Sequence, residues 1–376
     1  RLIEEGAGVL RGLRVGLITN HTGTTADGSR STIDVLNEHP DLQLVALFSP
    51  EHGIRGAAEA GESVASGRDA RTGLPIHSLY GETRAPTAAM LEGIDALVFD
   101  IQDIGARYYT YIWTMALALQ AAAEHDRLFV VLDRPNPIGG TLVHGNVLDP
   151  EFATFVGLYP VPMRHGMSVG EMARFINAEY DIGARLHVVT AIGWQRDQWL
   201  DQTAMRWQPP SPNMPTLESA AHYPGTCLFE GTNLSVGRGT PAAFQQIGAP
   251  WLDAAAVVAR LRALRLPGVA FDAVTFTPHQ PGDGKYADTL SYGVRYTVTD
   301  RAHYDPTHTA IATLAAIQAM HPDSLQFRVS HFDRLAGTDA VRTAILAGAS
   351  AADITAGWAA QLEAFRARSA PYLLYR

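Results

Sequence analysis

The stretch LQLVALFSPEHG, residues 42–53, joins a β-rich apolar run to a polar turn that opens with Pro50. Apolar side chains at successive positions cover both faces of an extended segment, which is typical of a strand buried between two layers. Proline and glycine frame the pair Glu51 and His52, so we expect the strand to end there. This stretch therefore predicts a buried parallel strand whose carboxyl end carries an acid and a histidine.

Four further segments repeat the pattern of an apolar run followed by a polar turn. These segments are Leu13–Thr19, Ala96–Ile101, Leu128–Leu132 and Leu186–Ile192. Segments with helical spacing lie between the strands, at residues 31–38, 87–92, 110–124 and 168–180. Strand–helix alternation of this kind predicts an α/β fold, a Rossmann-like doubly wound domain with a mostly parallel sheet.

The alternation stops at residues 208–241, which are dense in Pro, Gly, Asn and Ser. We expect an ordered loop or an interdomain crossing there. Beyond it, helices are expected at 251–264, 307–320 and 350–366, and strands at 269–276 and 292–298. This irregular mixture predicts a second, smaller α+β domain. The expected division is therefore residues 1–235 and 236–376.

Composition excludes several classes of protein. The 376 residues are 47% hydrophobic, enough for a sizeable core, and carry a net charge of −9 without a basic cluster, so nucleic acid is not expected as a partner. No apolar run reaches the roughly 18 residues of a membrane-spanning helix. The single cysteine, Cys227, excludes a disulfide within the chain and predicts a small buried side chain. No pattern predicts an oligomeric state.

Polar side chains follow four successive predicted strands. Because the carboxyl ends of parallel strands share one edge of a sheet, we expect these side chains to converge there. The candidates are Asn20, His21, Glu51, His52, Asp100, Asp103, Arg107, Tyr109, Asp133, Arg134 and Asn136. Structural roles compete with this interpretation, since Asn and Asp cap turns and helices, and an aspartate–arginine cluster can hold a loop in place.

Two later motifs add acids and an arginine. In HGMSVGE, residues 165–171, Ser168 and Glu171 have the spacing of a capping box before a helix. In CLFEGTNLSVGRGT, residues 227–240, Glu230, Asn233 and Arg238 stand in a glycine-rich loop. Glycines beside Arg238 allow close backbone approach, so its guanidinium suits a carboxylate on a substrate, or Glu230 itself.

Several well-known signatures are missing from the sequence. The chain contains no G-x-G-x-x-G after its first strand, no G-x-x-x-x-G-K-[ST], no H-E-x-x-H and no G-x-S-x-G. The sequence therefore does not support dinucleotide binding, P-loop phosphate binding, zincin proteolysis or α/β-hydrolase chemistry.

Seven strings together resemble a bacterial family formerly catalogued as a domain of unknown function, the NamZ-type exo-β-N-acetylmuramidases. The strings are SPEHGIRG, FDIQDIGARYYTYI, VLDRPNPIGG, VPMRHGMSVGE, PSPNMP, YPGTCLFEGTNLSVGRGT and FRARSAPYLLY. The resemblance runs from about Arg14 to Tyr375. It implies an enzyme that removes terminal β-linked N-acetylmuramic acid from the non-reducing end of peptidoglycan fragments, in a cleft between a Rossmann-like domain and a smaller one. We expect no cofactor and no metal in the site.

Glycoside hydrolysis usually requires one protonated and one ionised carboxyl group. Given the resemblance, we expect Glu51 to be the general acid, oriented by His52, and Glu230 to be the second carboxylate. Glu171 and Asp103 are the alternatives to Glu230. Specific binding of muramic acid requires a cation for its lactyl carboxylate, and three arginines are candidates. These are Arg107, Arg134 and Arg238.

Two other functions stay open at this point. A metal-dependent hydrolase could use oxygen and nitrogen ligands near the strand ends, namely His21, Glu51, His52, Asp100 and Asp103. Alternatively, the chain could bind muramyl glycans without cleaving them. For the location, we favour a secreted or periplasmic protein, whose leader is absent from this chain, over a cytoplasmic one.

Overall fold

A computed structural model describes residues 7–54 and 65–376 of the chain. Its main sheet has seven strands in the order β3-β4-β2-β1-β5-β6-β9. They are β1 (Arg14–Thr19), β2 (Gln43–Ser49), β3 (Gly67–Arg68), β4 (Pro75–Ser78), β5 (Ala96–Asp100), β6 (Leu128–Leu132) and β9 (Arg185–Val189). All neighbouring strands are parallel except the edge pair β3 and β4. The five predicted strands of this sheet are confirmed.

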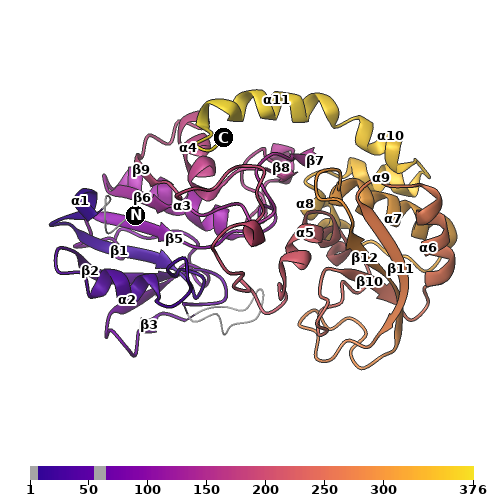
Figure 1. Ribbon diagram of the computed structural model, residues 1–376, viewed down its shortest axis with the longest axis horizontal. Helices are drawn as coiled ribbons and strands as arrows, with labels where there is room; N and C mark the ends of the chain where they lie inside the picture. The colour runs from indigo at the N-terminus through magenta and orange to yellow at the C-terminus, as the bar shows by residue number, and fades with distance from the viewer. Residues whose placement is uncertain (1–6, 55–64) are drawn as a thin grey trace.

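Helices cover both faces of the sheet (Figure 1). One face carries α1 (Ala7–Leu10) and α2 (Thr32–Asn37), and the other carries α3 (Tyr111–Glu124) and α4 (Val169–Glu179). In β5, Leu97 and Phe99 belong to the apolar cluster under α3 and α4, whereas Ala96 and Val98 belong to the cluster under α2. Burial on both faces explains the continuous apolar runs, and the doubly wound α/β prediction is confirmed.

The second part of the chain, from α5 at Leu217 onward, is built on a small antiparallel sheet with helices, which confirms the predicted α+β character. Its strands are β10 (Gln246–Ala249), β11 (Val269–Phe276) and β12 (Ser291–Val298), in the order β10-β12-β11. Its helices are α5 (Leu217–Thr226), α6 (Ala254–Ala263), α7 (Pro306–Met320), α8 (Val329–Ala336), α9 (Ala340–Leu346), α10 (Ala351–Ala356) and α11 (Ala359–Ser369). A separate hairpin pairs β7 (His144–Val147) with β8 (Pro162–Arg164).

Three expected elements differ from the structure. Residues 87–92 form turns rather than a helix: the Leu91 amide reaches the Thr87 carbonyl oxygen, but the backbone turns away at Gly93, whose φ is 74°. The expected helix over 350–366 is interrupted at Gly357, where α10 ends, and restarts as α11. The expected loop over 208–241 contains a whole helix, α5, despite Pro224 within it.

Close packing explains why α5 forms in a segment rich in helix breakers. Thr216 caps its first turn by accepting a hydrogen bond from the Ser219 amide. A Cβ atom on Gly225 would lie 1.9 Å from the Pro306 carbonyl oxygen at the start of α7, so glycine lets the two helices approach. α5 therefore packs against α7, which lies beyond residue 235 in the sequence. The domain boundary at residue 235 stays a prediction.

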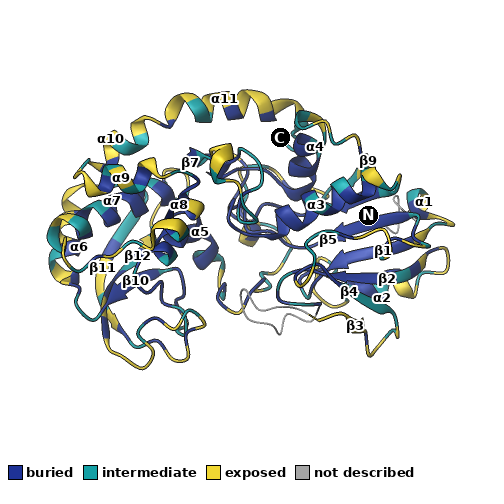
Figure 2. Cartoon of the chain, turned by 180° about the vertical axis from the view of Figure 1, so that it is seen from behind, coloured by how far each residue is buried: buried dark blue, intermediate teal, exposed yellow. Residues whose placement is uncertain are grey.

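The C-terminal segment returns to the first sheet. α11 arches over both parts of the molecule and ends beside α4 (Figure 1). It is largely exposed, with only Phe365 and Ser369 buried (Figure 2). Phe365 packs edge-on against Phe175 of α4 at a centroid distance of 5.5 Å, and the Leu374 amide donates to Glu171 of α4 at 2.8 Å. The chain end therefore ties the two parts together.

Candidate active site

A cavity of about 250 Å³ lies between the two parts of the molecule. From the first part, its walls include Glu51, His52, Tyr80, Tyr109, Thr110, Ser211 and Asn213. From the second part, they include Tyr223, Glu230, Arg238, Asp283, Lys285, Arg328, His331 and Arg334. Glu51 and Glu230, 179 positions apart in sequence (230 minus 51), thus face the same small space.

The turn after β2 presents Glu51 to the cavity. His52 and Gly53 both adopt left-handed backbone conformations, with φ values of 70° and 75°, and such a conformation in a non-glycine residue often marks a functional site. The Thr110 hydroxyl, just before α3, donates to Oε2 of Glu51 at 2.6 Å. Burial raises the pKa of Tyr80, and the neighbouring Glu51 carboxylate raises it further. The Glu51 carboxylate therefore lies beside the hydroxyl groups of Thr110 and Tyr80.

Glu230 forms an ion pair with Arg238. Its Oε1 accepts from Nε of Arg238 at 2.7 Å and from Nη2 at 2.6 Å. Burial alone would lower the pKa of Arg238, but the Glu230 carboxylate outweighs burial and the pKa is raised. Gly237 and Gly239 flank the arginine with φ values of 75°, as the glycine-rich loop requires. The pair places a positive charge directly beside the Glu230 carboxylate.

Lys285 fixes the backbone under Glu230. Its Nζ donates to the carbonyl oxygens of Phe229 at 3.2 Å, Glu230 at 3.2 Å and Leu234 at 2.9 Å. Burial lowers the pKa of Lys285 to about 8, although Asp283 and Glu230 oppose this effect. All three ammonium protons are therefore used in holding the loop that carries Glu230.

Aromatic rings form one wall of the cavity. Tyr223 packs edge-to-face with Tyr109 at a centroid distance of 5.7 Å and with Phe244 at 4.7 Å. Burial raises the pKa of both Tyr109 and Tyr223, so both hydroxyls stay protonated near neutral pH. The wall can pack against an apolar face of a ring, while the acids and amides opposite it can contact polar groups.

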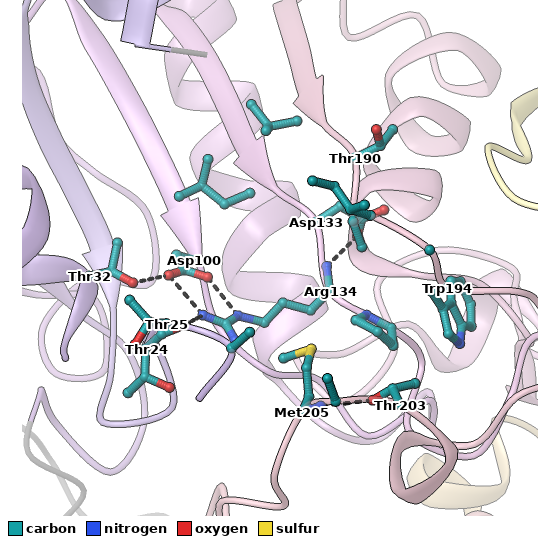
Figure 3. A pocket seen from close by; sticks show the side chains of 18 of the residues that line it. Thr24, Thr25, Thr32, Asp100, Asp133, Arg134, Thr190, Trp194, Thr203 and Met205 are labelled. Atoms are coloured by element: carbon teal, nitrogen blue, oxygen red, sulfur yellow. Dashed lines mark hydrogen bonds and ion pairs between the residues drawn. The ribbon is translucent and has the colours of Figure 1, made fainter. Parts of the chain in front are cut away.

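Three predicted site residues lie in a different cavity, of about 770 Å³, at the carboxyl ends of β5, β6 and β9 (Figure 3). Asp100 accepts from Nε of Arg134 at 2.7 Å and from the Thr32 hydroxyl. Asp133 accepts from the hydroxyls of Ser168 and Tyr375, each at 2.6 Å. Burial raises the pKa of Asp133 to about 6, against these hydrogen bonds. The predicted single convergence of polar strand ends is thus divided between two cavities.

Arg107 lies outside both cavities and is fully buried. Its Nη1 donates to the carbonyl oxygens of Asn146 and Val161, and its Nη2 donates to those of Leu335 and Ala336, over distances of 2.8–3.0 Å. These carbonyls come from the β7–β8 hairpin region and from α8, so the guanidinium joins the two parts of the chain. Its contacts are those of a structural residue.

Glu171 and Asp103 also make internal contacts. Glu171 completes the predicted capping box with Ser168 and accepts from Nη1 of Arg196 at 2.6 Å. Oδ2 of Asp103 accepts from the Gly105 amide at 2.7 Å and lies 3.6 Å from Nε2 of His165. Neither carboxylate lines the cavity that holds Glu51.

Four further predicted residues bind the chain itself. Oδ1 of Asn20 accepts from the Thr22 hydroxyl at 2.6 Å, and Nε2 of His21 lies 2.7 Å from the Pro209 carbonyl oxygen. The remaining contacts are those of Asn136 with the Met167 carbonyl and the Ile138 amide, and of Asn233 with the Ser324 carbonyl and the Gln326 amide. These contacts fit the turn and capping roles that competed with a binding role.

Sequence reasoning missed several residues of the cavity. They are Tyr80, Tyr223, Asp283, Lys285, Arg328, His331 and Arg334. Asp283 and Lys285 lie in a turn-rich segment between β11 and β12, where Asp and Lys are ordinary surface residues. The α8 residues carry no local motif, so only the folded structure reveals them.

The structure tests two other features of the chain. Within residues 7–54 and 65–376, no group of three or more His, Cys, Asp or Glu side chains is arranged to hold a metal ion, so the five residues considered for a metal site do not form one. In the same ranges, no helix has the length and apolar character needed to cross a membrane.

Comparisons with known proteins agree with this architecture. The family model described as "Exo-beta-N-acetylmuramidase NamZ, N-terminal" matches residues 15–218, and the corresponding C-terminal model matches residues 221–375. A curated relative from Bacillus subtilis (strain 168), named "Peptidoglycan beta-N-acetylmuramidase NamZ", is 46% identical over 367 residues, which cover 97% of this chain and 88% of the relative.

Two solved structures share the fold. Both are crystal structures of DUF1343 family proteins from Bacteroides fragilis NCTC 9343. One is 37% identical with a TM-score of 0.93 and a match over 100% of this chain and 97% of that one. The other is 33% identical with a TM-score of 0.78 and a match over 100% and 98%. On the matches to both of its halves and to the curated relative, this chain belongs to the NamZ exo-β-N-acetylmuramidase family.

Proposed function

We propose that this chain is a glycoside hydrolase that releases terminal β-linked N-acetylmuramic acid from the non-reducing end of peptidoglycan fragments. The curated relative carries the name of a peptidoglycan β-N-acetylmuramidase. The observation that carries the proposal is the cavity itself, in which Glu51 from one part of the chain faces the same space as Glu230 from the other. Two carboxyl groups across a small cavity are what glycosidic cleavage requires.

Glu51 is proposed as the general acid. Its carboxyl proton passes to the glycosidic oxygen as the bond to the anomeric carbon breaks, and the leaving sugar departs as a neutral alcohol. The Thr110 hydroxyl, 2.6 Å from Oε2, donates to the carboxylate that remains. This hydrogen bond strengthens as negative charge develops on Glu51, so it favours the proton transfer.

Glu230 is proposed as the second carboxylate, ahead of Glu171 and Asp103, which lie outside the cavity. Arg238 contacts its carboxylate through Nε and Nη2, and Lys285 donates to its backbone carbonyl oxygen. Glu230 either removes a proton from the attacking water or attacks the anomeric carbon itself. A third route uses the N-acetyl group of the substrate as the nucleophile, with a carboxylate assisting. NMR of the first-formed anomer separates inversion from retention.

The remaining cavity residues are proposed to bind the sugar. The Tyr109–Tyr223–Phe244 wall offers apolar contact to a pyranose ring. Oδ2 of Asp283 is buried without a hydrogen-bond partner in the part of the chain that the structure describes, so it can accept from a substrate hydroxyl or amide. His52 is proposed to orient Glu51.

A chromogenic assay tests the proposal. Purified protein is expected to release nitrophenol from a nitrophenyl β-N-acetylmuramide and free N-acetylmuramic acid from muramyl-terminated peptidoglycan fragments. Excess chelator is expected to leave the rate unchanged, because no step uses a metal ion. Binding of the fragments without release of sugar would instead favour a non-catalytic glycan-binding protein, and loss of activity in chelator would favour the metal-dependent alternative.

A further inference from the structure

Two arginines in the candidate cavity have no acidic partner in the part of the chain that the structure describes. Arg328 and Arg334 both line the space that holds Glu51 and Glu230. Among residues 7–54 and 65–376, no carboxylate forms an ion pair with either guanidinium, and the one side-chain contact is from Nη2 of Arg334 to Nδ1 of His331, at 3.4 Å. Two positive charges therefore stand at the cavity without an internal counter-ion.

The fold directs these charges to the cavity. Arg328 is the N-cap of α8, and His331, Arg334 and Leu335 follow at intervals that place them on one side of the helix. The position of α8 is fixed at Gly231, where a Cβ atom would lie 2.5 Å from Cα of Phe332. The Arg328 amide also donates to the Gly231 carbonyl oxygen at 2.8 Å. The cavity-facing side of α8 is therefore set by backbone contacts.

The other cations of the cavity are already engaged. Arg238 is neutralised by Glu230, and the ammonium group of Lys285 is occupied by three backbone carbonyls. Arg107 and Arg134, two of the arginines expected to bind a carboxylate, lie outside this cavity. An anion entering the cavity thus meets Arg328 and Arg334 as its available partners.

The electrostatics around His331 agree with this arrangement. Burial lowers the pKa of His331, and the positive charges of Arg334, Lys285 and Arg328 lower it further. The Glu230 carboxylate acts in the opposite direction but does not reverse the effect. Three of the four charged side chains that act on His331 are therefore cationic, and two of them are Arg328 and Arg334.

We propose that Arg328 and Arg334 form an anion-binding subsite that receives the lactyl carboxylate of N-acetylmuramic acid. The inference rests on the proposed function and names the side chains that distinguish the substrate from N-acetylglucosamine. The lactyl ether is the group by which the two sugars differ, and its carboxylate matches the paired N–H donors of a guanidinium. Two arginines on one helical face can bind it from two directions.

The test compares Arg328→Gln, Arg334→Gln and the double variant with wild type, and uses Arg260→Gln as a matched control. Arg260 is an exposed arginine of α6 outside the cavity. Two measurements are made: kcat/KM for nitrophenyl β-N-acetylmuramide relative to the matching glucosaminide, and calorimetric binding of the two free sugars. We expect the double variant to lower the muramide preference about 10- to 100-fold, with each single variant lowering it less.

Binding and turnover separate the failure of this inference from the failure of the proposed function. If the double variant keeps the wild-type preference in both measurements, or if wild type shows no preference, the subsite assignment is overturned. If wild type binds N-acetylmuramic acid preferentially but releases no nitrophenol, the hydrolase proposal fails. In that case calorimetric binding alone tests the subsite. Loss of the preference for N-acetylmuramic acid in the double variant would support the subsite assignment.

Discussion

The Thr110 hydroxyl donates a 2.6 Å hydrogen bond to Oε2 of Glu51. This hydrogen bond connects the residue just before α3 to the turn that follows β2. The bond fixes the orientation of the carboxyl group within a cavity that also contains Glu230. A positioned acid in the same cavity as a second carboxylate is the basis of the proposed mechanism.

Removing the Thr110 hydroxyl should slow the reaction without abolishing it. Thr110→Val keeps the side-chain shape but takes away the donor that stabilises the Glu51 carboxylate as it forms. We expect kcat to fall about 2- to 10-fold, the usual value of one hydrogen bond. Thr114→Val is the matched control, because the buried Thr114 hydroxyl has no partner within the described residues. An equal loss in both variants would assign the effect to packing of α3.

Breaking the Glu230–Arg238 pair should reduce stability as well as activity. The two side chains are only 16% and 12% exposed, so Arg238→Gln leaves a largely buried carboxylate without its counter-charge. The expected loss in the free energy of unfolding is about 3 kcal/mol. Arg262→Gln, which breaks an ion pair with Asp272 that is about 60% exposed on each side, should cost less than about 1 kcal/mol. Urea unfolding measures both, and equal losses would contradict the assigned burial.

Asp133 should make stability depend on pH in a direction unusual for a carboxylate. Burial raises its pKa from 3.8 to about 6 in the folded chain. The folded state holds this proton more tightly than the unfolded state. The contribution of Asp133 to the free energy of unfolding is therefore full below about pH 4 and is lost as pH rises to about 6. The loss amounts to about 3 kcal/mol.

The pH effect is measured as a difference between proteins, because other carboxylates also titrate in this range. Urea unfolding of wild type and Asp133→Asn is followed from pH 4 to pH 7. Wild type should lose stability relative to the variant over this interval and run parallel to it above pH 7. Asp272→Asn, at an exposed site, serves as the control. Parallel curves for wild type and Asp133→Asn throughout would show that Asp133 titrates normally.

The sequence predicted those parts of the fold whose signals are local. Strands buried on both faces, such as β5 and β6, carry continuous apolar runs, and their positions were predicted to within two residues. α5 was missed because Pro224 and Gly225 weaken its local helical signal, while its packing on α7 is a tertiary effect. Tertiary contacts override local propensity in such segments.

The candidate site was predicted in part for the same reason. Glu51 and Glu230 stand in distinctive strings, so the two proposed catalytic carboxylates could be named before the cavity was known. Asp100, the last residue of β5, instead pairs with Arg134 in the second cavity, a division that strand order alone does not reveal. Arg328 and Arg334 reach the first cavity only because α8 packs at Gly231, a contact between residues about 100 positions apart in sequence.

The most direct test of the central claim is turnover by Glu51→Gln on two substrates with different leaving groups, with Glu363→Gln on the exposed side of α11 as control. In a muramyl disaccharide the leaving group is a sugar hydroxyl whose oxygen must be protonated, whereas nitrophenolate leaves readily without a proton. If Glu51 is the general acid, kcat on the disaccharide falls about 10²- to 10⁴-fold, with a much smaller loss on the nitrophenyl muramide and an unchanged melting temperature. Wild-type turnover of the disaccharide by Glu51→Gln would contradict the account.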